Sequence, residues 1–376
     1  MKRKDMSGGQ HRPGTAVMGR RRFLKQTGKG LLVLSLSPVL SRCGGGDPGD
    51  PDETFHFAVL SDTHIFERED AHRHTVMADT VTWLNTFSPA LDFVVITGDV
   101  LDYLPSDDPA HYHEHHTSLH RLREFADGFR MPLHLVLGNH DYYTGGPVWH
   151  PPTSDRPARE RLFMDWMGMP GPYYAFEHRG VKFYCLNTMQ RDPSFDHDSN
   201  SIGIFGPEQV AWLDGQLRDG KPGILFHHHP LATQLTTSIG FAAVIPFEVP
   251  RAEGRFLKYR GTPFEDYTDP IYELLEDHRG QIRASFFGHS HLFMQEPEGC
   301  EGVNLFMTDS MKFPSFTRYP PGDGGRPMRF HIVACRAGSG TFDIYNAYMI
   351  SYRREGRGSV GPQPEARQVP DPALFL

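Results

Sequence analysis

The sequence predicts an α/β fold in which a parallel sheet brings polar side chains together at one edge. Two observations support this prediction. First, strand-like and helix-like segments alternate between residues 55 and 138, and a βαβαβ order requires crossover helices between parallel strands. Second, five apolar runs of strand composition stop abruptly at short polar clusters. In α/β proteins, buried strands present functional groups in this way at their carboxyl ends.

The first part of the expected fold consists of three strands and two helices. Its first helix is predicted to end before Ser88-Pro89, because this dipeptide breaks the helical pattern. The predicted elements are a strand over 55–61, a helix over 70–87, a strand that ends at 98, a helix over 109–125 and a strand that ends at 138.

The remaining pattern is weaker. Residues 142–170 are rich in Pro, Gly and aromatic residues and predict a long loop region over the site, and residues 231–268 form an insertion. The predicted elements are a hairpin over 173–184, helices from 206 and over 270–278, and strands over 303–307, 330–334 and 341–345. One domain is therefore expected over 54–350, followed by a C-terminal tail over 351–376.

Residues 1–43 differ from the rest of the chain. The sequence Arg-Arg-Arg-Phe-Leu-Lys at 20–25 precedes an apolar run over 30–40 that is too short to span a bilayer as a stable helix. This arrangement is close to the twin-arginine export pattern, so we interpret residues 1–43 as a signal peptide. The expected partner is the twin-arginine translocase, and the expected location is the periplasm or the envelope. Met18 leaves the start codon open.

The end of this leader resembles the lipobox of bacterial lipoproteins, in which a cysteine is acylated. The sequence Leu-Ser-Arg-Cys ends at Cys43, but the residue before that cysteine is normally small, and Arg42 departs from the pattern. Simple cleavage and a lipid anchor at Cys43 both remain open. In either case, the Gly- and Pro-rich segment over 44–53 is expected to be a flexible linker.

Charge argues against a polymeric substrate. Residues 1–43 contain ten of the 38 Lys and Arg residues and one of the 46 Asp and Glu residues, so the rest of the chain has a formal net charge of −17. Such a surface repels a nucleic-acid backbone. We therefore expect a small phosphorylated substrate and no nucleic-acid polymer as a partner.

The cysteines do not indicate a thiolate metal site, because the sequence contains no Cys-x-x-Cys pair. Cys185 and Cys335 fall inside expected strands, and Cys300 falls in an expected loop. At most one disulfide can form among these three residues, and buried free thiols are favoured at the two strand positions.

The polar strand ends supply carboxylate, amide and imidazole groups. Without thiolates, this mixture of donors suits Zn, Mn or Fe. Seven donors exceed the needs of one tetrahedral ion and suit two ions that share a carboxylate. Such sites stabilise the attacking and the leaving oxygen of a displacement at phosphorus, so phosphoester hydrolysis is the expected reaction. The seven candidate ligands are Asp62, His64, Asp99, Asn139, His228, His289 and His291.

In order and spacing, the motifs resemble the signature of the calcineurin-like metallophosphoesterase family. The resemblance covers about residues 55–310 and implies a four-layer α/β/β/α sandwich of two mixed sheets with helices outside. The motifs are Asp62-x-His64, Gly98-Asp99, Gly138-Asn139-His140-Asp141, His228-x-Pro230 and Gly288-His289-x-His291.

The resemblance also implies the role of each matched residue. A hydroxide between two divalent or trivalent metal ions would attack phosphorus. His140, oriented by Asp141, would stabilise the transferring oxygens or protonate the leaving group. The choice of His228 over its neighbours His227 and His229 rests on the family's His-x-Pro pattern. The implied ligands are Asp62, His64 and His291 for the first ion, Asn139, His228 and His289 for the second, and Asp99 as a bridge.

Differences from the motifs of three other branches narrow the choice of the branch of the family that this chain resembles. Protein Ser/Thr phosphatases have Arg where Tyr103 stands and Glu where Asp141 stands. Purple acid phosphatases place a tyrosine ligand where this chain has Asp102, and 5′-nucleotidases add a large carboxyl-terminal domain for which little chain remains. After these exclusions, the chain resembles bacterial phosphodiesterases of cyclic nucleotides and glycerophosphodiesters, and monoester substrates remain open.

The expected function is an exported, metal-dependent hydrolase of small phosphodiesters or phosphomonoesters. Two alternatives remain open. An envelope hydrolase of phospholipids or lipid-linked phosphates would agree with an anchor at Cys43 and with the aromatic loops. A non-catalytic metal-binding envelope protein would gain support if residues 142–170 or 231–268 blocked the pocket.

Overall fold

A computed structural model describes the protein over residues 53–65, 71–102, 118–142, 156–190, 203–233, 236, 244, 249–250, 256–257, 269–311, 327–351 and 358–360. All of these residues belong to one unit, Gly44–Leu376. The predicted signal peptide, Cys43 and Tyr103 lie outside the described residues, as does most of the predicted insertion. Within the described ranges, no helix is long and apolar enough to cross a membrane.

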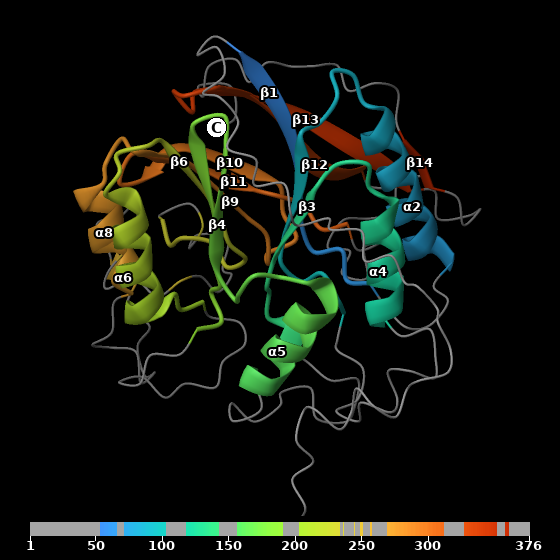
Figure 1. The fold of residues 1–376 in the computed structure, drawn as a ribbon, viewed down its shortest axis with the longest axis horizontal. Coiled ribbons are helices and arrows are strands. Elements are labelled where there is room, and N and C mark those ends of the chain that lie inside the picture. Colours follow the sequence, from blue (N-terminus) through green and yellow to red (C-terminus); the bar gives the residue numbers. More distant parts are fainter. Residues whose placement is uncertain are drawn as a thin grey trace, which may run out of the picture. The chain divides into compact units, whose positions relative to one another are not determined.

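Two six-stranded mixed sheets form the framework (Figure 1). The first sheet has the order β14 (Gly358–Val360), β13 (Phe342–Ser351), β12 (Pro327–Arg336), β1 (Thr54–Leu60), β2 (Phe93–Thr97) and β3 (Leu133–Val136). The second has the order β10 (Met294–Cys300), β11 (Val303–Met307), β9 (Ile282–Phe287), β6 (Gly223–Phe226), β5 (Val181–Cys185) and β4 (Tyr174–His178). A separate ribbon pairs β7 (Val249–Pro250) with β8 (Phe256–Leu257).

Parallel pairing places the functional strand ends on one edge of each sheet. Strands β1, β2 and β3 are parallel in the first sheet, and β5, β6, β9 and β11 are parallel in the second. The antiparallel strands lie beside these parallel groups. The helices are α2 (Ala71–Thr86), α4 (Ser118–Gly128), α5 (Arg156–Met167), α6 (Gly206–Leu217), α8 (Ile271–Asp277) and the short 3-10 helix η1 (His140–Tyr142).

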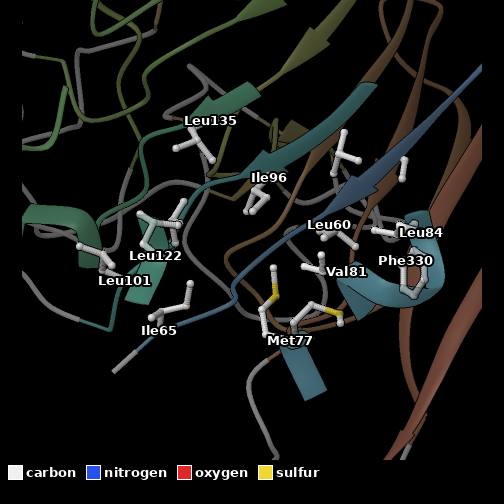
Figure 2. Close-up of a cluster of buried hydrophobic side chains, with 14 of the residues drawn as sticks. Leu60, Ile65, Met77, Val81, Leu84, Ile96, Leu101, Leu122, Leu135 and Phe330 are labelled. Carbon is white, nitrogen blue, oxygen red and sulfur yellow. The ribbon is translucent and has the colours of Figure 1, made fainter. Parts of the chain in front are cut away.

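The alternation of side chains along β1 shows how the layers form. Phe57 and Val59 face the buried cluster between the two sheets, whereas Ala58 and Leu60 face a second cluster on the outer side of the first sheet. Figure 2 shows Leu60 in this second cluster together with Met77 of α2. Helices α2 and α4 cover that side, and α6 and α8 cover the second sheet (Figure 1). The predicted four-layer sandwich of two mixed sheets is therefore confirmed.

Aromatic rings fill the space between the sheets. The Phe57 ring stacks on Phe93 at a centroid distance of 4.8 Å and meets the edge of Phe183 at 5.5 Å. Such ring pairs add about 0.5–1.5 kcal/mol each to the burial of their apolar area. The framework that carries the site is thus joined by a dense apolar interior.

Two expectations from the sequence are corrected by the structure. Residues 142–170, predicted as a loop region, contain the helix α5. Its apolar residues Phe163 and Trp166 pack on the cluster beneath α2 and α4, and Pro157 is compatible with a first helical turn. Part of the predicted tail over 351–376 is a strand, because β14 pairs with β13.

The other predicted elements agree with described ones, although β13 continues beyond its predicted end at 345. The strand β10, which ends at Cys300, and the short strands β7 and β8 were not predicted. The predicted helix over 109–125 is described only from Ser118, where α4 begins. The described cysteines Cys185, Cys300 and Cys335 are all buried and free, which confirms the expectation for the two strand positions.

Candidate metal centre

The candidate ligands come from both sheets. The loops that follow β1, β2 and β3 carry the ligands of the first sheet, and the loops that follow β6 and β9 carry those of the second. Because these strands point the same way within each sheet, their carboxyl ends lie side by side. The first sheet contributes Asp62, His64, Asp99 and Asn139, and the second contributes His228, His289 and His291.

The backbone at five of these residues lies in the left-handed region. Non-glycine residues rarely adopt a positive φ, and each such residue costs on the order of 1–3 kcal/mol unless the surroundings hold it in place. The chain therefore turns sharply after β1, β2 and β9, the three strands that these residues follow. The five φ angles are 50° at Asp62, 43° at His64, 48° at Asp99, 69° at His289 and 53° at His291.

The glycines of the motifs permit the strand ends to approach closely. A Cβ atom at Gly98 would lie 2.5 Å from Nδ1 of His228. A Cβ at Gly138 would collide with Asp99, and one at Gly288 would collide with Ser61 and Asp62. Each motif glycine is thus required by packing against a neighbouring strand end.

One group of ligand atoms consists of Asp62, His64, Asp99 and His291, whose atoms lie within 4.8 Å of one another. Nε2 of His291 lies 3.1 Å from Nε2 of His64 and 3.2 Å from Oδ1 of Asp62. This Oδ1 atom is buried and accepts no hydrogen bond from any described residue. An orphaned carboxylate oxygen beside two ring nitrogens fits a cation.

A second group consists of Asp99, His228 and His289. The amide oxygen Oδ1 of Asn139 belongs with it, at 3.1 Å from Nε2 of His228 and 3.0 Å from Nδ1 of His289. Oδ1 of Asp99 lies 3.2 Å from Nε2 of His228. Asp99 belongs to both groups, so the donors fit two cations that share one carboxylate.

Outer contacts fix which atoms of the ligands remain available. Nδ1 of His228 donates to the carbonyl of Thr97 at 2.9 Å, which directs Nε2 toward Asp99 and Asn139. Oδ2 of Asp62 accepts a hydrogen bond from the Ser61 hydroxyl at 2.6 Å and one from the His289 amide at 3.1 Å, which leaves Oδ1. These contacts prepare the ligand atoms for metal binding.

The three consecutive histidines His227, His228 and His229 make different contacts. His227 lies close to Ser285 through Nε2 at 2.5 Å and to the carbonyl of His229 through Nδ1 at 2.7 Å. Nδ1 of His229 lies 2.7 Å from the hydroxyl of Thr188. Nε2 of His228 lies beside Asp99 and Asn139, whereas the ring of His229 lies against His289 at a centroid distance of 4.2 Å.

Burial and charge shift the pKa values of the site in opposite directions. Burial opposes the charge on Asp62, but the neighbouring His291 and His228 lower the Asp62 pKa to about 2. Burial also opposes the charge on His228, but Asp99 raises the His228 pKa to about 9. For His289, burial and the neighbouring His228 lower the pKa to about 3. Without metal, the charge on His228 thus offsets only part of the negative charge of Asp62 and Asp99, which favours the binding of cations.

The ring of His140 is held by the carbonyl of Asp102, to which Nδ1 donates a hydrogen bond at 2.8 Å. Oδ1 of the Asp102 side chain lies 3.0 Å from Nδ1 of His64. The side chain of His140 is 25% exposed and therefore accessible to a bound ester. Sequence reasoning missed the importance of Asp102, although its position three residues after Asp99 was a usable signal.

The expectation that Asp141 orients His140 is corrected. The Asp141 carboxylate accepts hydrogen bonds from the backbone amides of Gly138 and Leu101, each at 2.8 Å, and of Val100 at 3.3 Å. Asp141 therefore ties the loop after β3 to the loop after β2. Burial and the nearby charge of the Asp99 carboxylate raise the pKa of Asp141 to about 7.

Comparison with known proteins gives two kinds of result. A search of curated proteins found no significant match. Similar solved structures include a protein assigned as a 5′-nucleotidase from Staphylococcus aureus (16% identity, 75% of this chain, 51% of that chain, TM-score 0.41). They also include a phosphopantetheinyl hydrolase from Mycobacterium tuberculosis (15% identity, 72% of this chain, 100% of that chain, TM-score 0.37). A 5′-nucleotidase from Candida albicans is similar as well (11% identity, 78% of this chain, 52% of that chain, TM-score 0.42). The chain spans about half the length of the two nucleotidases.

The family model described as calcineurin-like phosphoesterase matches residues 55–293. This range contains every candidate ligand from Asp62 to His291. Two metal ions are typical of the family, and two groups of ligand atoms joined by Asp99 agree with that number. The chain therefore belongs to the calcineurin-like phosphoesterase family.

Proposed function

We propose that this protein is an exported phosphoesterase with two metal ions that hydrolyses small phosphodiesters or phosphomonoesters. The observation that carries the proposal is the pair of ligand groups that share Asp99, with the partly exposed His140 beside them. The ring centroids of His140 and His64 are 4.5 Å apart, so His140 lies at the edge of the first group.

The proposed ligands divide between the two ions according to the two groups. When bound, the ions supply an activated nucleophile and positive charge for the phosphoryl oxygens. Fe, Mn and Zn all suit these nitrogen and oxygen donors. The ligands are Asp62, His64 and His291 for the first ion, Asn139, His228 and His289 for the second, and Asp99 for both.

The chain's own residues perform the remaining tasks. The Asp102 carbonyl keeps the proton of the His140 ring on Nδ1, so Nε2 is the atom that receives or donates a proton. We propose that His140 hydrogen-bonds the transferring oxygens or protonates the leaving group through Nε2. Asp141 supports this loop indirectly, through its three backbone hydrogen bonds.

The proposed substrate is small and carries one phosphoester group. The formal net charge of −17 beyond residue 43 disfavours a nucleic-acid polymer. The motif departures at Tyr103 and Asp141 favour the branch of bacterial phosphodiesterases for cyclic nucleotides and glycerophosphodiesters.

A pair of chromogenic esters tests the proposed activity. Protein loaded with Mn or Zn should hydrolyse bis-p-nitrophenyl phosphate or p-nitrophenyl phosphate, and Asp99→Asn should abolish turnover. Asp127→Asn is the matched control, because it removes an exposed carboxylate on α4 and should leave turnover unchanged. Absence of turnover on both esters with two ions bound would contradict the proposal. Faster hydrolysis of phospholipid vesicles than of soluble diesters would favour the lipid alternative.

Export is tested separately. We propose that the twin-arginine translocase delivers the protein to the periplasm or the envelope, where Cys43 is a candidate for a lipid anchor. Replacing both Arg20 and Arg21 by Lys should abolish the periplasmic fraction in a cell fractionation. An unchanged distribution would argue against this route, and mass spectrometry of the mature amino terminus would show whether Cys43 is acylated.

A further inference from the structure

The two halves of the metal centre belong to different sheets, so their relative position is not fixed by backbone pairing. The loop after β3 carries Asn139 and His140 in the first sheet, whereas His228 and His289 follow strands of the second. The proposed second ion needs donors from both halves. Whatever joins the loop after β3 to the second sheet therefore controls the geometry of that ion.

A group of three polar side chains makes this connection, two of them buried and the third, Glu160, half-buried. The hydroxyl of Tyr142, at the end of η1, donates to Oε2 of Glu160 on α5 at 2.7 Å. Nδ2 of Asn187, which follows β5 of the second sheet, donates to the Tyr142 hydroxyl at 2.8 Å and to Glu160 at 3.1 Å. The three residues thus join the first sheet, α5 and the second sheet by three hydrogen bonds.

Both ends of this connection are rigid. The backbone amide of Tyr142 donates to the carbonyl of Asn139 at 3.3 Å. The 3-10 turn therefore fixes Tyr142 relative to Asn139, a proposed ligand. At the other end, the Gln209 side chain accepts a hydrogen bond from the Asn187 amide and donates one to the Asn187 carbonyl, both at 2.9 Å. Oδ1 of Asn187 accepts a further hydrogen bond from the amide of Met189 at 2.8 Å.

Burial makes these contacts costly to lose. The exposed fraction is 1% for Tyr142 and 0% for Asn187. Burial also raises the pKa of the Glu160 carboxyl, although the hydrogen bonds from Tyr142 and Asn187 oppose this effect. Removing one partner would leave buried polar atoms without hydrogen bonds, which the loop after β3 can relieve by moving.

We propose that Tyr142, Glu160 and Asn187 are positioning residues that hold Asn139 and His140 in register with the ligands of the second sheet. None of the three is a proposed ligand or proton donor. They act through the turn between Asn139 and Tyr142. This inference rests on the proposed function for its kinetic readout, and metal affinity gives a readout that does not depend on turnover.

The chain offers a matched control for the tyrosine. Tyr184 of β5 is also fully buried, but its hydroxyl has no hydrogen-bond partner among the described residues. It packs in the cluster beneath α6 and α8 instead of beside the site. Tyr142→Phe and Tyr184→Phe therefore remove the same atom from two buried tyrosines, and only the first loses hydrogen bonds.

The first experiment compares these two variants in the full-length protein. For Tyr142→Phe, we expect about tenfold weaker binding of the second Mn²⁺ ion in a calorimetric titration, because outer contacts of metal ligands contribute on this scale. On bis-p-nitrophenyl phosphate, kcat should fall about tenfold with KM nearly unchanged. Tyr184→Phe should change none of these values by more than about twofold.

A second pair of variants separates positioning from a general contribution to folding. Glu160→Gln keeps an acceptor oxygen and should retain most of the metal affinity and kcat, whereas Glu160→Ala should show the same losses as Tyr142→Phe. If Glu160→Ala and Tyr142→Phe lowered only the melting temperature, with metal affinity and kcat at wild-type values, the inference would be overturned. If wild type showed no turnover while the affinities followed the expected order, the proposed function would fail and the positioning role would stand.

Discussion

The interior between the two sheets and the polar edge at their carboxyl ends are built on opposite principles. Between the sheets, Phe57, Phe93 and Phe183 are buried and packed ring against ring, and no described aromatic residue of this interior has a positive φ. At the edge, Asp62 and Asp99 are equally buried, yet they are charged and held in left-handed backbone. The first region stabilises the fold, and the second depends on that stability.

This contrast means that the two regions should respond differently to substitution. A change between the sheets should lower the free energy of unfolding and leave the chemistry of the folded molecules intact. A change at the edge should remove activity with little loss of stability, because strained and charged residues contribute little to folding before metal binds.

The largest effect is expected at His140. His140→Ala removes the proposed proton donor without removing a ligand, so kcat on p-nitrophenyl esters should fall by about 10²–10⁴-fold. Metal content, measured by elemental analysis, should stay at the wild-type value, and the melting temperature should not decrease. A variant with more than half of the wild-type kcat would rule out His140 as the acid.

The next largest effect is expected between the sheets. Phe183→Ala should lower the free energy of unfolding by about 3–5 kcal/mol in a urea titration, because it leaves a cavity among stacked rings. Phe183→Leu should cost less and yield folded protein for kinetics. We expect kcat per folded molecule of Phe183→Leu to match wild type, and a loss of kcat comparable to that of His140→Ala would remove the distinction between the two regions.

A pair of glycine substitutions tests the packing at the edge. Gly288→Ala places a Cβ against Ser61 and Asp62, so it should weaken metal binding and lower kcat at least tenfold. Gly215→Ala on α6 meets no atom within 4 Å and should stabilise the helix by up to about 1 kcal/mol. Equal metal affinity for the two variants, measured by calorimetry, would show that close approach at Gly288 is not required.

The smallest effect concerns pH and lies away from the metal centre. Burial alone would raise the pKa of Asp92. Hydrogen bonds from His178 and from the amide of His56 together outweigh this effect, so the net shift of the pKa is downward. A carboxyl with a lowered native pKa stabilises the fold above its unfolded pKa, and this contribution is lost as the pH falls through the native pKa. Asp92→Asn should therefore destabilise the metal-free protein at pH 7 more than at pH 3 in urea titrations. An equal difference at both pH values would contradict this.

The comparison also explains what the sequence was able to predict. Apolar strands that stop at Gly98 and Gly138 are local patterns, and the close packing of these glycines explains why the motif residues occur at fixed spacing. The parallel strands and the grouping of polar strand ends followed from such patterns, whereas the sandwich of two mixed sheets followed from the resemblance to the metallophosphoesterase family. The helix α5 was missed because the segments before and after it are rich in proline and glycine, which favours a loop prediction for the whole region.

Contacts across the fold were beyond prediction from sequence. The hydrogen bond between His140 and the Asp102 carbonyl involves a backbone atom, which leaves no signature in residue type. The connection from Tyr142 to Asn187 joins residues 45 positions apart on different sheets. The expectation that Asp141 orients His140 followed from the family resemblance, whereas the carboxylate accepts hydrogen bonds from backbone amides of the neighbouring loop.

We propose that two cations share Asp99 at the junction of the two sheets. Anomalous diffraction from crystals of the Mn- or Zn-loaded protein, recorded on either side of the metal absorption edge, tests it most directly. We predict two anomalous peaks about 3.5–4 Å apart, one beside Asp62 and His64 and the other beside Asn139 and His228, with Asp99 between them. A single peak that Asp99 does not contact, or no peak among these residues, would contradict the account.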